Sequence, residues 1–338
     1  MVEGRLKPRR ADLAIAGFLA LITVIANATG MPYVLFPELG ALGWVIFSDP
    51  RHSWARSPAL LMLTPFLAAV QGLWLTRHLA YGPPAVLLDV GLTLLVIAAL
   101  RSPIVPSLSA GLLPLALGIH TWTYPFSILI GTGGLALFIG LRARWARGGS
   151  PQPAGATEPA PGLWALRGRT QPLPPLRDWL GPFGLFLVGG LLLVRLIGSP
   201  LVLFPPLLVI TFEMVVHRRH CPWRGRYVGV WLVANGAAAA GLVLVKTLGV
   251  TPLATFLAVL ATLALLKLAR LPFPPALGLA LLPFVIPDPP LSYPLFTMAG
   301  SLWLLLVVAL QEALAGPDPG GGDGGGTTAA PGGEPGTA

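Results

Sequence analysis

The sequence predicts an all-α, polytopic membrane protein with about twelve transmembrane helices in two parallel six-helix repeats. Only 10% of its 338 residues are charged and its mean hydropathy is +0.76, whereas about a quarter of the residues in a soluble domain are charged. Uncharged apolar runs follow one another along the chain. Backbone groups in hydrocarbon must be paired within a helix or a closed barrel, and these runs are too long and continuous for barrel strands, so we expect helices.

A tandem repeat is the second observation, and it sets the expected domain organisation. Shifted by 169 positions, the run 101–125 places Arg101 on Arg270 and each of its prolines on a proline. Shifted by 168 positions, residues 32–37 fall on 200–205. Five regions are therefore expected: a cytoplasmic basic N-terminus (1–10), a first transmembrane repeat (11–145), a flexible Pro/Gly-rich cytoplasmic linker (146–178), a second transmembrane repeat (179–314) and a disordered Gly/Pro-rich tail (315–338).

Each repeat contains six apolar segments. They lie at about 12–30, 33–47, 58–76, 84–100, 104–119 and 124–141 in the first half, and at about 181–198, 201–216, 228–248, 252–268, 273–287 and 293–311 in the second. A helix that crosses a membrane needs about 20 residues, with a range of roughly 17–25. The second and fifth segments of each half are short for a full crossing, and each begins at or just before a turn that contains proline.

The distribution of Lys and Arg predicts the orientation. If all twelve segments cross and the N-terminus is cytoplasmic, 19 of the 22 Lys and Arg residues lie inside, and only Arg77, Arg195 and Lys246 lie outside. An even number of crossings per half makes the repeats parallel, whereas one re-entrant segment per half would make them inverted. The charge count favours the first alternative, with both termini cytoplasmic, in a cell inner membrane. The positive-inside rule also explains the net charge of +9. The expected partner is therefore the lipid bilayer and not nucleic acid.

No enzyme signature is present. The chain has no dinucleotide or phosphate-binding glycine loop, no His-Glu-x-x-His and only one cysteine, Cys221. His217, His220 and Cys221 lie close enough in sequence to bind a metal, but arginines flank them, and a solvated basic loop is the preferred interpretation. We therefore expect no enzymatic activity, no cofactor and no metal.

The second half, over about 180–311, resembles the HPP family of integral membrane proteins. The residues that carry this resemblance are the proline-rich entry Phe204-Pro205-Pro206 into a short apolar segment, a cationic loop ending near Arg224, a Gly/Ala-rich helix and the run from Arg270 to Ala276. The first half is similar more weakly, at residues 40–47. Phe273 occupies the position of the family's name-giving histidine. The resemblance implies transport of nitrite across a bacterial or chloroplast-type membrane.

Short segments interrupted by proline, at matching places in two halves, independently indicate the midplane site of a transporter. Where proline breaks a helix, backbone N–H groups lose their partners and point into the gap, which suits a small inorganic anion such as nitrite. In the alternative interpretation these prolines only shape the ends of lipid-buried helices. The candidate substrate-path residues are Pro37, Glu38, Gly40, Arg101, Pro106, Ser107, Pro205, Pro206, Glu213, Arg270, Pro274 and Pro275.

Ionisable residues inside the apolar segments are further candidates, because charge at membrane depth is costly. Glu213 is the deepest by sequence; it relays a proton in anion–proton symport, is held in its neutral form, or simply faces the basic loop that follows it. Asp89 is expected at the interface, about one turn from its helix end. Arg101 and Arg270 are expected to anchor at the inner interface, with gating or anion collection as the alternative.

Two function classes follow from these patterns. A transporter predicts polar or charged residues that face a central cavity between the repeats. A non-transporting scaffold or sensor predicts a closed and uniformly apolar interface at the same place. An intramembrane enzyme lacks any recognisable set of residues.

Overall fold

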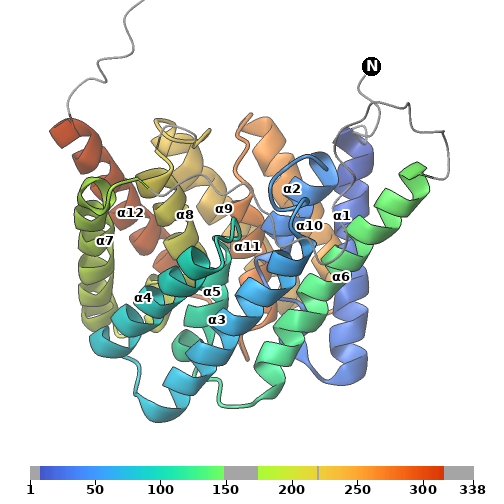
Figure 1. The fold of residues 1–338 in the computed structure, drawn as a ribbon, viewed down its shortest axis with the longest axis horizontal. Coiled ribbons are helices and arrows are strands. Elements are labelled where there is room, and N and C mark those ends of the chain that lie inside the picture. Colours follow the sequence, from blue (N-terminus) through green and yellow to red (C-terminus); the bar gives the residue numbers. More distant parts are fainter. Residues whose placement is uncertain (1–7, 148–173, 219–220, 316–338) are drawn as a thin grey trace, which may run out of the picture.

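The computed structural model describes residues 8–147, 174–218 and 221–315. Within these residues the chain forms twelve α-helices and three short 3₁₀ helices, so the predicted all-α class is confirmed (Figure 1). The first half contains α1 (Pro8–Thr29), η1 (Pro32–Val34), α2 (Leu39–Ser48), α3 (Pro58–His78), α4 (Pro83–Ala99), α5 (Ser107–Leu117) and α6 (Thr123–Arg147). The second contains α7 (Leu176–Ile197), η2 (Pro200–Val202), α8 (Pro205–Val216), α9 (Tyr227–Leu248), α10 (Pro252–Leu268), α11 (Pro275–Leu281), η3 (Leu282–Phe284) and α12 (Tyr293–Ala315).

Six of these helices are long and apolar enough to cross a membrane, namely α1, α3, α6, α7, α9 and α12. The chain is therefore a multi-pass integral membrane protein. The expectation of about twelve transmembrane helices is wrong in the described residues, where α4 and α10, with 17 residues each, are at the lower limit for a crossing and the second and fifth elements of each half are shorter still. Those elements, α2, α5, α8 and α11, are short as predicted, since the chain enters each of them through a turn that contains proline.

Proline and glycine mark the helix ends. Pro58, Pro83, Pro205 and Pro252 each begin a helix, where the missing N–H costs no hydrogen bond. Thr251 caps α10 by accepting a hydrogen bond from the backbone N–H of Ala254 at 3.2 Å. The expected linker and tails fall mostly on residues 1–7, 148–173 and 316–338, which lie outside the described residues.

The same local geometry occurs in both halves at a spacing of 169 residues. Arg101 and Arg270 are both non-glycine residues with positive φ, at 47° and 50°, in the turns after α4 and α10. A Cβ atom on Gly72 of α3 would lie 2.0 Å from the carbonyl oxygen of Gly111 in α5, and one on Gly241 would lie 2.0 Å from that of Ala280. These glycines let the backbones of α3 and α5, and of α9 and α11, touch.

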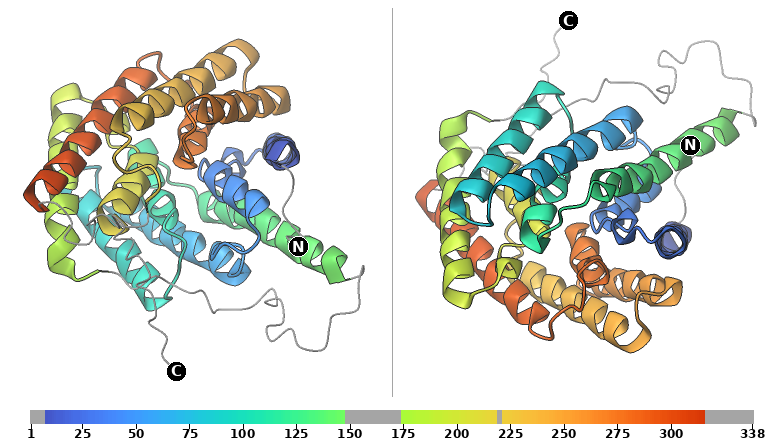
Figure 2. Two further views of the ribbon diagram at one scale, coloured as in Figure 1. Left: turned by 90° about the horizontal axis from the view of Figure 1, so that it is seen from above. Right: turned by 90° about the horizontal axis from the view of Figure 1, so that it is seen from below.

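Short helices of one half pack on short helices of the other half. Helix α2 packs on α11 of the other half, and α8 packs on α5. Similarly, α1 packs on α10, and α7 contacts α4. Seen from above, α2, α8 and α11 lie toward the middle, with α1, α6, α7 and α12 toward the outside (Figure 2). The proline-entered helices of both halves therefore meet at the centre of the bundle.

Hydrogen bonds fix which loops share a face. Arg226 donates to the carbonyl oxygens of Ala269 and Arg270, at 2.9 and 2.6 Å, and so joins the end of α10 to the loop before α9. In the same region Lys267 pairs with Asp12 of α1, and Arg224 pairs with Glu312 of α12 at 2.5 Å. The start of α1 and the end of α12 thus lie on one face, which we call the arginine-rich face.

The opposite face is defined in the same way. Asn27 at the end of α1 donates to the carbonyl oxygen of Val250 at 2.9 Å, and Lys246 pairs with Asp288 at 2.6 Å. The loops after α1, α9 and α11 therefore share this second face.

Candidate functional site

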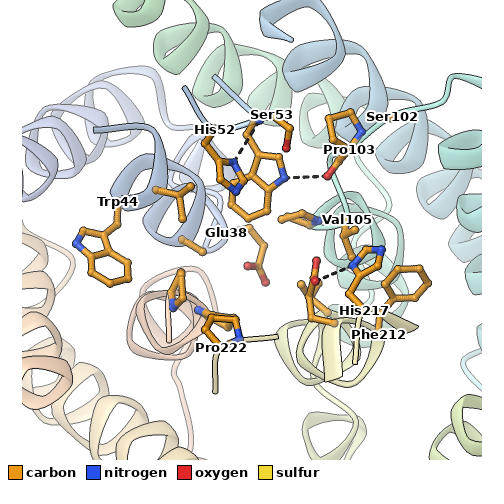
Figure 3. A pocket seen from close by; sticks show the side chains of 18 of the residues that line it. Glu38, Trp44, His52, Ser53, Ser102, Pro103, Val105, Phe212, His217 and Pro222 are labelled. Atoms are coloured by element: carbon orange, nitrogen blue, oxygen red, sulfur yellow. Dashed lines mark hydrogen bonds and ion pairs between the residues drawn. The ribbon is translucent and has the colours of Figure 1, made fainter. Parts of the chain in front are cut away.

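A cavity of about 970 Å³ lies between the two halves and extends from the loops of the arginine-rich face to the start of α2. We call it the vestibule. Its walls come from α2 and α8, from the turns that lead into α5 and α11, and from the loops around residues 49–54 and 222–223. Glu38 lies near the centre of the lining side chains, with His52 and His217 on different sides of it (Figure 3). The interface between the halves is thus hollow and partly polar, as expected for a transporter.

The vestibule brings together half of the predicted substrate-path residues. Those that line it are Glu38, Arg101, Pro106, Glu213, Pro274 and Pro275. The others, Pro37, Gly40, Ser107, Pro205, Pro206 and Arg270, are not among its lining residues. Gly40 instead packs on α11, where a Cβ atom would lie 2.8 Å from that of Leu277. Arg101 and Arg270 are exposed at the arginine-rich face.

Glu38 is fully buried at the floor of the vestibule, one residue before α2. Its Oε1 atom accepts a hydrogen bond from the Ser109 hydroxyl of α5 at 2.7 Å, and its Oε2 atom has no hydrogen-bond partner among the described residues. A Cβ atom on Gly278 of α11 would lie 3.2 Å from Oε2. Ser109 and Gly278 are 169 residues apart, so Glu38 sits between equivalent positions of the two repeats.

The prediction that proline leaves free N–H groups at these helix starts is wrong where the structure describes them. Leu39, Ser107, Leu207 and Ala276 each donate their N–H to the carbonyl oxygen three residues earlier, at 2.9, 3.2, 3.0 and 3.2 Å. The turns that contain proline are tight enough to supply an acceptor within their own loop. Only the dipoles of the helices, and not free donors, point toward the floor.

Glu213 lies one turn before the end of α8 and bonds the Nδ1 atom of His217 at 2.8 Å. This geometry matches the interpretation in which Glu213 faces the basic loop. Burial by itself lowers the pKa of His217, but the hydrogen bond and the charge of Glu213 outweigh it and raise that pKa above its ordinary value. Helix α8 ends at Val216, where the apolar segment was expected to end, so Glu213 lies in its last turn beside the loop that follows.

Asp89 was expected at the interface, about one turn from its helix end. Its side chain is fully buried within the protein, on α4. Gln71 of α3 lies beside it, with its amide nitrogen 3.4 Å from Oδ1 of Asp89 and 2.6 Å from the hydroxyl of Thr93. The position of Asp89 along α4 does not predict its burial, because α3, α5 and α7 cover α4.

The site also contains aromatic residues and a histidine that sequence analysis did not select. Trp54 donates its indole N–H to the carbonyl oxygen of Pro103 at 2.8 Å and thereby fastens the loop 49–56 to the turn before α5. Burial lowers the pKa of His52, against the opposing charges of Asp49 and Glu213. Trp223 packs edge-on against Phe273, with ring centroids 5.5 Å apart. The repeated Arg-His pair at 51–52 and 219–220 was the available signal for His52.

The suggested metal ligands are not assembled in the described residues, which contain no group of three or more metal-ligating side chains. His220 lies outside the described residues, and burial raises the pKa of the Cys221 thiol to about 12. Comparison of the chain with protein-family models, with curated proteins and with solved structures gave no match. The resemblance to the HPP family therefore stays a prediction, and the function is argued from the vestibule.

Proposed function

We propose that this chain is a membrane transporter for a small inorganic anion such as nitrite, which it carries together with a proton on Glu38. The observation that carries the proposal is the position of Glu38. A fully buried carboxyl group, with one oxygen unpartnered among the described residues, stands at the floor of a cavity where short helices of both repeats meet. Irregular backbone and ionisable groups at membrane depth are characteristic of transport pathways.

The proton follows from the surroundings of Glu38. The only hydrogen-bond partner of its carboxyl group among the described residues is the neutral hydroxyl of Ser109. An isolated carboxylate in a dry environment costs several kcal/mol, as an order of magnitude, so its charge needs compensation. A proton on Glu38 makes its carboxyl group neutral, so a monovalent anion bound beside it meets no second negative charge, and the occupied site carries one negative charge instead of two.

The anion is supported by the entrance of the vestibule and by the family resemblance. Arg101 lines the cavity on the arginine-rich face together with the acidic residues Asp49 and Glu213, and its cationic side chain attracts anions. The helix dipoles of α2 and α5 point toward the floor. The resemblance of the second half to the HPP family makes nitrite the favoured cargo.

We further propose that both described ends of the chain are cytoplasmic. Support comes from the loops, since both described ends lie on the arginine-rich face. By the positive-inside rule this face is cytoplasmic, and the vestibule then opens toward the cytoplasm of a cell with the chain in its inner membrane.

The test is uptake of ¹⁵N-labelled nitrite into proteoliposomes with and without an inward proton gradient. We expect saturable uptake that the gradient stimulates, and a loss of at least tenfold in Glu38→Gln. Asp12→Asn is the matched control, because Asp12 is a buried carboxyl outside the vestibule that pairs with Lys267. If reconstituted wild-type protein takes up neither nitrite nor nitrate, the proposal is wrong and the scaffold or sensor interpretation replaces it.

A further inference from the structure

A second buried carboxyl group, Asp89, lies outside the vestibule. Gln71 donates its amide N–H groups toward the backbone oxygen of Asp89 at 3.0 Å, its Oδ1 atom at 3.4 Å and the hydroxyl of Thr93 at 2.6 Å. The Oδ2 atom is buried and has no partner among the described residues. Asp89 thus shares with Glu38 an unpartnered carboxyl oxygen and only neutral hydrogen-bond donors.

Helix α5 separates the two carboxyl groups. Ser109 of this helix bonds Glu38, while Gly111, two residues later, faces Asp89. A Cβ atom on Gly111 would lie 3.0 and 3.1 Å from the two carboxyl oxygens of Asp89. Residues two apart on a helix point to nearly opposite sides. The carboxyl groups of Glu38 and Asp89 therefore contact opposite sides of one short helix, less than a full turn apart along it.

The second repeat has no equivalent of this arrangement. The positions that correspond to Glu38, Gln71, Asp89 and Ser109 are Pro206, Ala240, Ala258 and Gly278. Two repeats that share helix order and turn geometry thus differ in one respect: the buried ionisable and amide groups around the fifth helix occur only in the first. Packing alone does not call for this difference, because the second repeat has the same helix order and turn geometry without these groups.

The surroundings of Asp89 favour a proton as the bound species. Of the elements packed on α4, α5 has no ionisable residue, and the ionisable residues of α3 and α7 lie near the helix ends, at Arg77, His78, Arg177, Asp178 and Arg195. On α6, Tyr124 donates its hydroxyl to the carbonyl oxygen of Ala110. None of the described cationic side chains bonds Asp89. The close approach of Gly111 leaves space for a proton and not for a hydrated metal ion.

We propose that Asp89, held by Gln71 against Gly111, is a second proton-binding site, and that protons cross the protein through the first repeat, between Glu38 on one side of α5 and Asp89 on the other. The role of this proton route in transport rests on the proposed function. The binding of a proton to Asp89 does not depend on that function, so each of the two proposals can be disproved without the other.

Proton occupancy is measured by infrared spectroscopy of the purified protein in lipid nanodiscs at pH 7, where protonated carboxyl groups give a C=O band distinct from that of carboxylates. We expect Asp89→Asn to remove one component of this band, Glu38→Gln to remove another, and Asp12→Asn to leave both. If Asp89→Asn does not fold, Thr93→Val keeps the carboxyl group, removes one partner of Gln71 and is expected to shift the Asp89 component. A band unchanged in both Asp89→Asn and Thr93→Val would overturn the site.

The route is measured with ¹⁵N-nitrite in proteoliposomes. We expect Asp89→Asn to lose at least tenfold of the stimulation by a proton gradient while keeping exchange of labelled for unlabelled nitrite, because exchange needs no net proton movement. Gradient-driven uptake at the wild-type rate in Asp89→Asn would overturn the route. Wild-type protein that transports no nitrite would remove the proposed function and the route, and the infrared band would still decide whether Asp89 holds a proton.

Discussion

Tyr124 and Tyr293, which are 169 residues apart, make the same hydrogen bond in the two halves of the protein. Each hydroxyl is fully buried and donates to a backbone carbonyl oxygen of the short helix in its own half, Ala110 in α5 and Leu279 in α11, both at 2.6 Å. Each bond ties a short helix to the long helix that follows it. Two equivalent hydrogen bonds therefore fix α5 and α11, the short helices next to the floor of the vestibule.

Removing either hydroxyl should destabilise the protein by a similar amount. We expect Tyr124→Phe and Tyr293→Phe each to lower the free energy of unfolding by about 1 kcal/mol, because each loses one buried hydrogen bond. Thermal unfolding in nanodiscs measures the effect. Tyr33→Phe is the control, since Tyr33 packs edge-on against Tyr124 without a side-chain hydrogen bond in the described structure. Equal stability of all three variants and the wild type would contradict the tether.

The close contact between α3 and α5 should not tolerate a side chain at Gly72. A Cβ atom there would lie 2.0 Å from the carbonyl oxygen of Gly111, and backbone cannot move aside as a flexible side chain can. We expect Gly72→Ala to lower the free energy of unfolding by about 1–3 kcal/mol, and Gly241→Ala to do the same in the second half. Gly91→Ala, in α4 with nothing within 4 Å of the added atom, should be neutral or stabilising. Destabilisation by Gly91→Ala instead would show that helix contacts do not explain the effect.

The pair of Glu213 and His217 should make stability depend on pH in one direction. The pKa of His217 is raised in the folded state above its ordinary value of 6.5. The pair's contribution is therefore full below pH 6.5 and is lost as the pH rises through the raised pKa. We expect the wild type to exceed Glu213→Gln in stability at acid pH, with the difference shrinking at alkaline pH.

Histidine NMR separates this pair from its neighbour. His217 should titrate above its ordinary pKa and His52 below it, because burial dominates at His52. Glu213→Gln should lower both pKa values, since the charge of Glu213 acts on both rings. A pKa of His217 that is unchanged in Glu213→Gln would contradict the pair.

Cysteine labelling tests which face is cytoplasmic. Cys221 is the only cysteine, and burial raises its pKa to about 12, so it should react slowly with maleimides at neutral pH. Leu291 is 78% exposed on the face opposite the arginines, and Arg56 is exposed on the arginine-rich face. A membrane-impermeant maleimide added to intact cells should label Leu291→Cys, and Arg56→Cys only after permeabilisation. The reverse pattern would place the vestibule on the outside.

Much of the fold was predictable from local sequence. The positions of the short helices followed from prolines such as Pro106 and Pro275, and the repeat followed from their spacing. The expected free N–H groups were wrong because a turn that contains proline also offers carbonyl oxygens, such as that of Ile104 to Ser107. Sequence showed where helices break, but not whether the broken ends are satisfied locally.

The sequence by itself determined that the chain is helical, lies in a membrane and contains a repeat, because hydropathy, charge and proline position act through local chemistry. The tertiary structure decided which ionisable groups are buried. Glu38 and Asp89 were candidates in the sequence, but the sequence did not show that both are fully buried, whereas Glu213 appeared deepest and instead pairs with His217 near the end of α8. Burial depends on which helices cover a residue, and in this protein the short helices of one repeat are covered by those of the other.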